Sequence, residues 1–204
     1  MTPKDELIAS LRREGFLKTR RVINAFMSVS REMFLPKDIR KHAYADQPLP
    51  IGRGQTISAP HMVAVMTELL DPEKGDRVLE VGAGSGYQAA ILSRLVKHVY
   101  TVELEKELAD FARNNLERAG IKNVEVVQGD GSRGLPRKAP FDRIIITCAV
   151  EDIPGALLEQ LKEGGIIVAP VGPYYRQTLI SGIKKRGGLR TTRHFPCIFV
   201  PLRH

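Results

Sequence analysis

Tryptophan is absent from this chain, cysteine occurs only twice, and aromatic residues make up only 6% of its 204 residues. The two cysteines, Cys148 and Cys197, exclude a disulfide framework and a four-ligand cysteine site for zinc, so we expect no metal. So few cysteines also suit a reducing compartment, and we expect a cytoplasmic protein. No window approaches the roughly 18 apolar residues of a membrane span. Residues 1–6 carry early acids without an apolar signal region, so no secretory leader is expected.

The composition that is present is sufficient for a hydrophobic core, with 43% apolar and 26% charged residues. These values are close to the globular average and exclude a disordered chain. The net charge of +8 is concentrated at the two ends, in residues 1–41 and 176–204. Basic ends either attract an anionic partner or are solvated faces that only aid solubility. No aromatic-rich basic stripe or nucleic-acid motif is present, so we expect no nucleic-acid partner.

Hydrophobic periodicity divides the chain into three parts. Residues before 28 have helical spacing, and a Pro- and Gly-rich stretch from about 36 to 60 predicts an ordered binding loop. From residue 60 to 175, short apolar strands alternate with helices, which predicts a parallel sheet covered on both faces. In the tail, apolar segments flank Arg186-Gly187-Gly188 and predict an antiparallel hairpin at one sheet edge. Strands are expected at 77–81, 98–102, 124–127, 141–147, 165–169, 177–181 and 195–200, and the last helix at 154–162.

These elements predict an α/β protein with a doubly wound, mostly parallel sheet, N-terminal helices and a C-terminal antiparallel hairpin. We expect one domain over residues 1–204, because no linker separates two cores. Within it, residues 1–60 supply helices and the binding loop, 61–175 the cofactor-binding core, and 176–204 the edge hairpin. A monomer is the default expectation, because the chain lacks coiled-coil heptads.

A glycine-rich turn follows the first core strand, in Val81-Gly82-Ala83-Gly84-Ser85-Gly86-Tyr87. Glycines at 82, 84 and 86 let the backbone approach a ligand where a Cβ would collide. A dinucleotide fingerprint needs its third glycine at position 87, where Tyr87 stands. The phosphate-loop pattern also fails, because no Gly-Lys-Ser/Thr follows.

Acidic residues stand at the ends of three successive strands. Glu80 lies at the crevice end of the first strand, where it would repel a pyrophosphate but suit a cationic ligand head. Glu103 ends the second strand, where an acid can accept both ribose hydroxyls. Asp130 follows the third strand and can accept from an adenine amino group. A nucleoside with a cationic head and no phosphate fits all three, which indicates S-adenosylmethionine. The alternative is a structural turn with solvated acids.

The chain resembles a known family, the protein-L-isoaspartate O-methyltransferases, over residues 5 to 202. The glycine and acidic elements are common to many methyltransferases, but the Gln55-Thr56-Ile57-Ser58 loop is specific to this family. The matching segments are Asp46–Met62, Val78–Ala90, Gly129–Asp130–Gly131, Ala139–Asp142, Leu161–Gly165, Pro170–Gly172 and Phe199–Leu202.

The resemblance implies a Rossmann-like S-adenosylmethionine-dependent methyltransferase that repairs damaged proteins. Such an enzyme methylates the α-carboxylate of an L-isoaspartyl residue, leaves S-adenosylhomocysteine, and yields an ester that collapses to a succinimide. Isoaspartyl-containing proteins and peptides would be its partners, and Ser58 its active-site serine. The expected substrate contacts are Ile51, Gly52, Ser58 and His61. The expected cofactor contacts are Gln55, Thr56, Ile57, Ser58, Glu80, Gly82, Gly84, Gly86, Glu103, Asp130 and Gly131.

The chemistry explains the lack of a catalytic triad. A carboxylate has a reference pKa near 4 and is already ionised at neutral pH, so alignment with the methyl group is what remains. Ser58 is therefore expected to orient the carboxylate by a hydrogen bond, and His61 to contribute to packing rather than act as a base. Cys148 ends a buried strand and Cys197 lies far in sequence from the crevice strands, which argues against a catalytic thiol.

Two other functions remain open on the residues alone. A methyltransferase acting on a small molecule or a nucleic acid would share the same core, and only the Gln55–Ser58 loop argues against it. A non-catalytic, cofactor-binding regulatory or RNA-associated protein is the other alternative.

Overall fold

The computed structural model describes every residue from 1 to 204. The first and third helices begin where the sequence provides a cap or a proline. The Thr2 hydroxyl accepts from the Asp5 amide at 3.2 Å and opens the first helix, and Pro60 occupies the first turn of the third. The α-helices are α1 (Pro3–Arg13), α2 (Arg20–Ser28), α3 (Pro60–Leu70), α4 (Tyr87–Ser93), α5 (Lys106–Arg118) and α6 (Gly155–Gln160). Short 3-10 helices are η1 (Arg31–Phe34), η2 (Lys37–His42), η3 (Gly131–Arg133) and η4 (Pro136–Lys138).

Seven strands form one sheet in the order β5-β4-β3-β6-β7-β8-β9. The first five in that order run parallel, whereas β8 and β9 are each antiparallel to the strand before them. This confirms the predicted doubly wound α/β fold with a C-terminal hairpin. The strands are β3 (Arg77–Val81), β4 (His98–Glu103), β5 (Val124–Gln128), β6 (Phe141–Ile146), β7 (Leu161–Val171), β8 (Gln177–Lys185) and β9 (Gly188–Cys197), and β1 (Leu49–Gly52) and β2 (Gln55–Ile57) form a separate hairpin.

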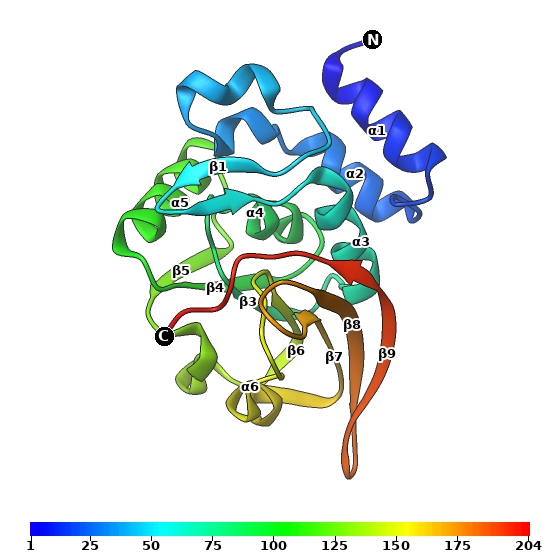
Figure 1. Cartoon of the computed structure of the whole chain (residues 1–204), viewed down its shortest axis with the longest axis vertical. Coiled ribbons are helices and arrows are strands. Elements are labelled where there is room, and N and C mark those ends of the chain that lie inside the picture. Colours follow the sequence, from blue (N-terminus) through cyan, green and yellow to red (C-terminus); the bar gives the residue numbers. More distant parts are fainter.

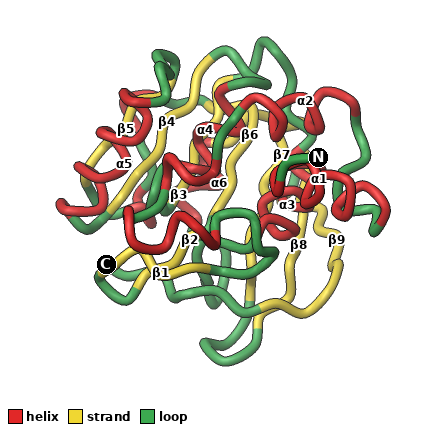
Figure 2. Tube along the Cα trace, turned by 90° about the horizontal axis from the view of Figure 1, so that it is seen from above, coloured by secondary structure: helices red, strands yellow, loops and turns green.

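Alternation along the strands divides the core into two layers. Val78 of β3 packs in the larger cluster with the N-terminal helices, and its neighbour Leu79 packs in the smaller cluster with Leu157 of α6. Figure 1 shows the corresponding layers, with helices α1 to α5 on one side of the sheet and α6 on the other. Seen from above, the two termini lie on opposite sides of the molecule (Figure 2).

Three segments differ from the sequence prediction. The stretch from 36 to 60 holds η2 and the β1–β2 hairpin rather than irregular loop. Strand β7 already begins at Leu161, because Leu161 pairs with Phe141, and α6 therefore ends at Gln160. Strands β8 and β9 extend to a two-residue turn, since Lys185 pairs with Gly188.

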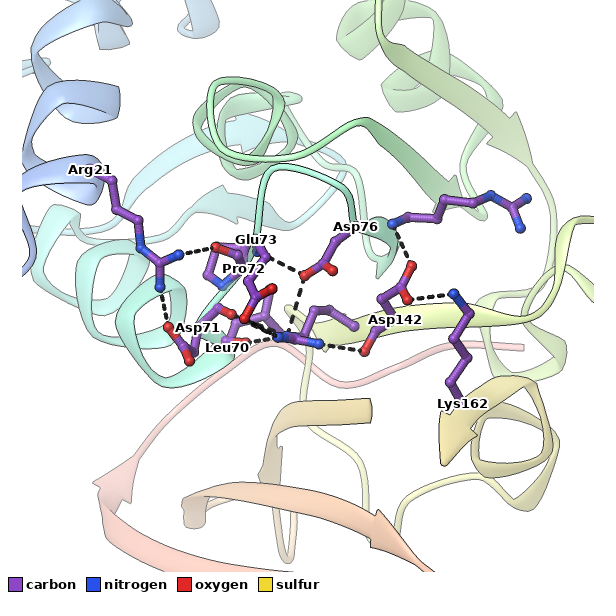
Figure 3. Close-up of polar contacts among 10 residues, drawn as sticks. Arg21, Leu70, Asp71, Pro72, Glu73, Asp76, Asp142 and Lys162 are labelled. Atoms are coloured by element: carbon purple, nitrogen blue, oxygen red, sulfur yellow. Dashed lines mark hydrogen bonds and ion pairs between the residues drawn. The ribbon is translucent and has the colours of Figure 1, made fainter. Parts of the chain in front are cut away.

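A cluster of charged residues joins α3, β3, β6 and β7 at the amino-terminal edge of the parallel strands (Figure 3). The Arg143 side chain is 12% exposed; its Nε lies 3.5 Å from an Asp76 carboxylate oxygen and donates to the Leu70 carbonyl at 3.0 Å. Asp142 accepts from the Arg77 amide at 2.8 Å and pairs with Lys162 at 2.5 Å. This cluster lies at the opposite end of the strands from Glu80 and Glu103.

None of the helices combines the length and the apolar character needed to span a bilayer.

Candidate functional site

The sheet has its topological switch point between β3 and β6. The chain leaves β3 toward β4 and leaves β6 toward β7, so the two connections run to opposite sides. Ligands of open α/β sheets bind in the crevice at the carboxyl ends of such strands. A cleft with about 600 Å³ of empty space lies there, with Glu80 and Gly82 after β3 and Thr147 and Cys148 after β6 on its wall.

Two glycines of the turn after β3 lie on the cleft wall. Gly82 has φ +99°, and a Cβ there would lie 2.6 Å from Thr147 Oγ1, so only glycine fits. The Gly84 amide donates to Glu103 Oε2 at 2.8 Å. Gly86 does not line the cleft: its Cβ would contact Leu116 at 3.3 Å, so this glycine lets α5 pack against the start of α4.

Glu103 is held in one orientation at the end of β4. Its Oε1 accepts from the Glu105 amide at 3.1 Å, while Oε2 is occupied by the Gly84 amide. The residue is only 8% exposed and lines the cleft. It thus presents a fixed carboxylate to whatever occupies the cleft.

Glu80 is fully buried, and neither carboxylate oxygen has a hydrogen-bond partner. Burial raises the pKa of Glu80 to about 8, and the charge of Glu103 adds to this rise; the nearby Thr101 hydroxyl partly opposes it, although its geometry falls short of a hydrogen bond. A buried carboxylate without a partner is unfavourable unless a cation or donor enters the cleft. The residues present therefore fit a ligand with a cationic head.

Asp130 lies beside the cleft rather than on its wall. It accepts from the Ser132 amide at 2.9 Å and from the Ser132 hydroxyl at 2.7 Å, and these bonds, the hydroxyl first, lower the pKa of Asp130. Gly131 lines a smaller adjoining cavity together with Gln55 and Glu103. The C-terminal segment lines the same cavity with Pro201, Leu202 and Arg203, and Arg203 pairs with Glu105 at 3.0 Å.

The β1–β2 hairpin and the residues that flank it, 47–58, form a flap over the cleft. All four predicted residues from Gln55 to Ser58 line the cleft. On the underside of the flap, Ile51 is buried, with its Cδ1 3.4 Å from the position of a Cβ at Gly84, whereas Gly52 is exposed at the turn with φ +95°. At the tip, Arg53 forms an ion pair with Glu107 of α5.

Ser58 also lines a second, larger groove beside the cleft, with about 1640 Å³ of empty space. His61 lies in this groove, where its Nδ1 is 3.0 Å from Asp46 Oδ1 and its ring packs 5.4 Å from that of Phe16. Ile51 and Gly52 are not among the groove residues, so of the four expected substrate contacts the structure brings Ser58 and His61 together.

Sequence reasoning missed the groove's aromatic wall. Phe16, Tyr174, Tyr175 and Phe195 line the groove, and so does Cys197 despite its distance in sequence from the crevice strands. Thr147, also missed, stands at the end of β6 and would have been found by the strand-end rule that identified Glu80. Burial raises the pKa of Cys148 to about 12 and that of Cys197 to about 11, so both thiols stay protonated at neutral pH.

A family model described as Protein-L-isoaspartate(D-aspartate) O-methyltransferase (PCMT) matches residues 2–204. A protein-L-isoaspartate O-methyltransferase from Methanopyrus kandleri is 53% identical over 204 residues, which cover 98% of this chain and 90% of the relative. One from Hyperthermus butylicus is also 53% identical, over 96% of this chain and 86% of the relative.

Solved structures agree with these matches. A protein-L-isoaspartate O-methyltransferase superimposes with a TM-score of 0.88 at 32% identity, covering 98% of this chain and 66% of that chain. A Plasmodium falciparum protein described as the same enzyme, in complex with S-adenosyl-L-homocysteine, gives a TM-score of 0.87 at 26% identity and covers 100% of this chain and 99% of that chain.

Proposed function

The chain belongs to the protein-L-isoaspartate(D-aspartate) O-methyltransferase family, and from this premise we propose which residues carry out the family's reaction. The protein is a repair methyltransferase that acts on L-isoaspartyl residues of damaged proteins and peptides. It methylates their α-carboxylate, and the ester then collapses to a succinimide. Its cofactor is S-adenosyl-L-methionine, which supplies a methyl group on a positively charged sulfur.

The proposed cofactor site is the cleft at the switch point. Glu103, fixed by two backbone amides, suits ribose hydroxyls, and the unpartnered Glu80 suits the cationic head. Gly82 and Gly84 provide backbone surface without a Cβ, and Gln55–Ser58 of the flap supply the facing wall. Asp130 and Gly131 remain proposed contacts at the adenine end, and Gly86 supports the turn from beneath.

One observation carries the proposed role of Ser58: this serine lies on the wall shared by the cofactor cleft and the open groove. A substrate carboxylate in the groove would therefore meet the cofactor beside the Ser58 hydroxyl. The hydroxyl can donate to one carboxylate oxygen and leave the other free to attack. No base is needed, since an α-carboxyl group with a reference pKa near 3.5 is already ionised.

His61 is the proposed second substrate contact. Asp46 Oδ1 accepts from the His61 amide at 2.9 Å and engages Nδ1, which fixes the ring at the groove wall. Two further proposals concern the whole chain. Its free cysteines support a cytoplasmic location, and we propose that it acts as a monomer.

The test follows labelled methyl from S-adenosylmethionine into two peptides that differ only in an isoaspartyl or an aspartyl residue. We expect label only in the isoaspartyl peptide. Ser58→Ala should lower kcat by roughly 10- to 100-fold, because alignment is lost. The affinity for S-adenosylhomocysteine should change little, and Ser28→Ala, in the remote helix α2, should match the parent.

Two outcomes would contradict these assignments. Loss of cofactor binding in Ser58→Ala with normal residual chemistry would refute the orienting role. Tight cofactor binding without transfer to any isoaspartyl peptide would favour a small-molecule or nucleic-acid methyltransferase, or a non-catalytic protein.

A further inference from the structure

Arg31 is the most deeply buried basic side chain of the fold, with 1% of its surface exposed. It begins η1, outside the cleft and the groove, and lines neither. No carboxylate lies within ion-pair distance of its guanidinium, and Nε has no hydrogen-bond partner. Burial accordingly lowers the pKa of Arg31, although Tyr87 and Asp46 oppose that shift.

A buried guanidinium without a carboxylate is costly, and an apolar side chain of similar volume would fill the same space at lower cost. The few contacts that Arg31 does make should therefore show what it is for. They are two backbone carbonyls and one aromatic ring.

The two carbonyls belong to the two ends of the flap. Nη1 donates to the Ser58 carbonyl at 2.9 Å, and Nη2 donates to the Gln47 carbonyl at 3.4 Å. Strands β1 and β2 run between these residues, so one planar guanidinium joins both stems of the hairpin. The rigid fork of arginine suits this task, whereas a lysine ammonium would act as a single point charge.

The ring belongs to the opposite wall of the cleft. The Arg31 guanidinium carbon lies 5.2 Å from the ring centroid of Tyr87, which opens α4 directly after the glycine turn. Burial raises the pKa of Tyr87 to about 12, so the ring is neutral and the contact is a cation–π interaction. Tyr87 is itself fixed by Phe34, with ring centroids 5.6 Å apart.

We propose that Arg31 is a positioning residue for methyl transfer, which sets the Ser58 backbone at a fixed place relative to the glycine turn that holds the cofactor. The inference rests on the proposed role of Ser58. Arg31 touches neither substrate nor cofactor; it acts through the Ser58 carbonyl on one side and Tyr87 on the other. The Arg53–Glu107 pair at the flap tip is exposed, and exposed pairs of this kind contribute little, whereas Arg31 supplies buried polar contacts to both ends of the flap.

Arg31→Met should lower kcat for an isoaspartyl peptide by roughly 10- to 100-fold, since a displacement of about 1 Å is enough to have that effect. Affinity for S-adenosylhomocysteine should fall by less than about fivefold, because β3 and β4 supply most cofactor contacts. Arg31→Lys should give an intermediate kcat, since one ammonium cannot hold both carbonyls.

The matched control is Arg21→Met. Arg21 also donates to a backbone carbonyl, that of Pro72 at 2.7 Å, but far from the cleft. It should lose stability without a change in kcat per folded molecule. A second readout is trypsin cleavage after Arg53, at the flap tip: cleavage of the S-adenosylhomocysteine-bound protein should accelerate in Arg31→Met and not in Arg21→Met.

Each outcome decides the inference. If a folded Arg31→Met or Arg31→Lys keeps kcat within about twofold of the parent, the positioning role is refuted. The same holds if kcat, cofactor affinity and melting temperature fall in proportion, because Arg31 is then only structural. If Arg31→Met does not fold, the kcat of Arg31→Lys decides whether the positioning role holds. Ser58→Ala in the same assay separates the two proposals. A normal kcat of Ser58→Ala refutes the role of Ser58, whereas a low kcat of Ser58→Ala together with a normal kcat of Arg31→Lys refutes only the role of Arg31.

Discussion

Gly131→Ala should weaken cofactor binding through a steric contact that the structure defines. A Cβ at Gly131 would lie 2.5 Å from Val81 Cγ1, whereas carbon atoms in contact are normally about 3.5–4.0 Å apart. Val81 cannot yield, because it is fully buried in β3, in the centre of the sheet. The loop from Asp130 to Ser132 must therefore move by about 1 Å.

The magnitude follows from the cost of such overpacking, typically about 1–3 kcal/mol. Each 1.4 kcal/mol is tenfold in affinity, so the dissociation constant for S-adenosylhomocysteine should rise by roughly 5- to 140-fold. Titration calorimetry measures this directly. The matched control is Gly129→Ala, two residues earlier in the same motif, since a Cβ there meets nothing within 4 Å.

Val81→Ala in the Gly131→Ala background removes the clashing methyl groups and should restore part of the lost affinity. Equal affinities of Gly131→Ala and Gly129→Ala would refute the reasoning. So would strict additivity in the double variant, because residues in contact should couple.

Three further predictions concern stability and titration. Arg143→Met should lower the free energy of unfolding by about 3 kcal/mol, since it leaves Asp76 without its cation and three carbonyls without a donor. Thermal melts should show a drop in melting temperature of roughly 6–12 °C. A drop no larger than that of Arg113→Met, at an exposed arginine, would contradict the prediction. Glu80 has its pKa raised in the folded protein, so the native state holds the extra proton between the ordinary pKa of 4.5 and about 8, and stability falls as pH rises through that window. Glu80→Gln should consequently be more stable relative to the parent at pH 9 than at pH 5. The same difference in melting temperature between variant and parent at both pH values would refute this. Because burial raises the pKa of both thiols, iodoacetamide at pH 7.5 should modify native Cys148 and Cys197 far more slowly than the unfolded chain, as mass spectrometry can measure; rapid native labelling of Cys148 would show that a thiolate forms.

The local sequence pattern was sufficient to predict the parallel strands and the residues at their carboxyl ends. Apolar runs such as Ile144–Ile146 predicted buried parallel strands, and acids one strand apart predicted a shared crevice. Both inferences hold for β3 and β4, whose Glu80 and Glu103 line one cleft because neighbouring parallel strands end at the same edge, whereas Asp130 lies beside that cleft. The helix that follows a strand was harder to delimit: α6 ends two residues earlier than predicted, since Leu161 pairs with Phe141 instead of continuing the helix.

Contacts between segments that are distant in sequence could not be predicted from local sequence pattern. Phe16, Tyr174 and Cys197 meet at one groove only because β9 and the N-terminal helices flank the same end of the sheet. Arg31 stands between the polar residues Ser30 and Glu32 and has the local signature of a solvated residue, and only the packed fold shows that it is buried beneath the flap. Gly86 similarly belongs to the turn by sequence but serves the packing of α5.

The sequence by itself thus determined the local motifs and their positions along the chain, namely the glycine turn, the three acids and the serine loop. These motifs depend only on spacing within single strand–turn–helix units. The tertiary structure decided which surfaces face one another: the flap against the cleft, the C-terminal segment against the groove, and Arg31 between Ser58 and Tyr87. The physical reason is that spacing constrains only near neighbours, whereas burial and close packing are properties of the whole folded chain.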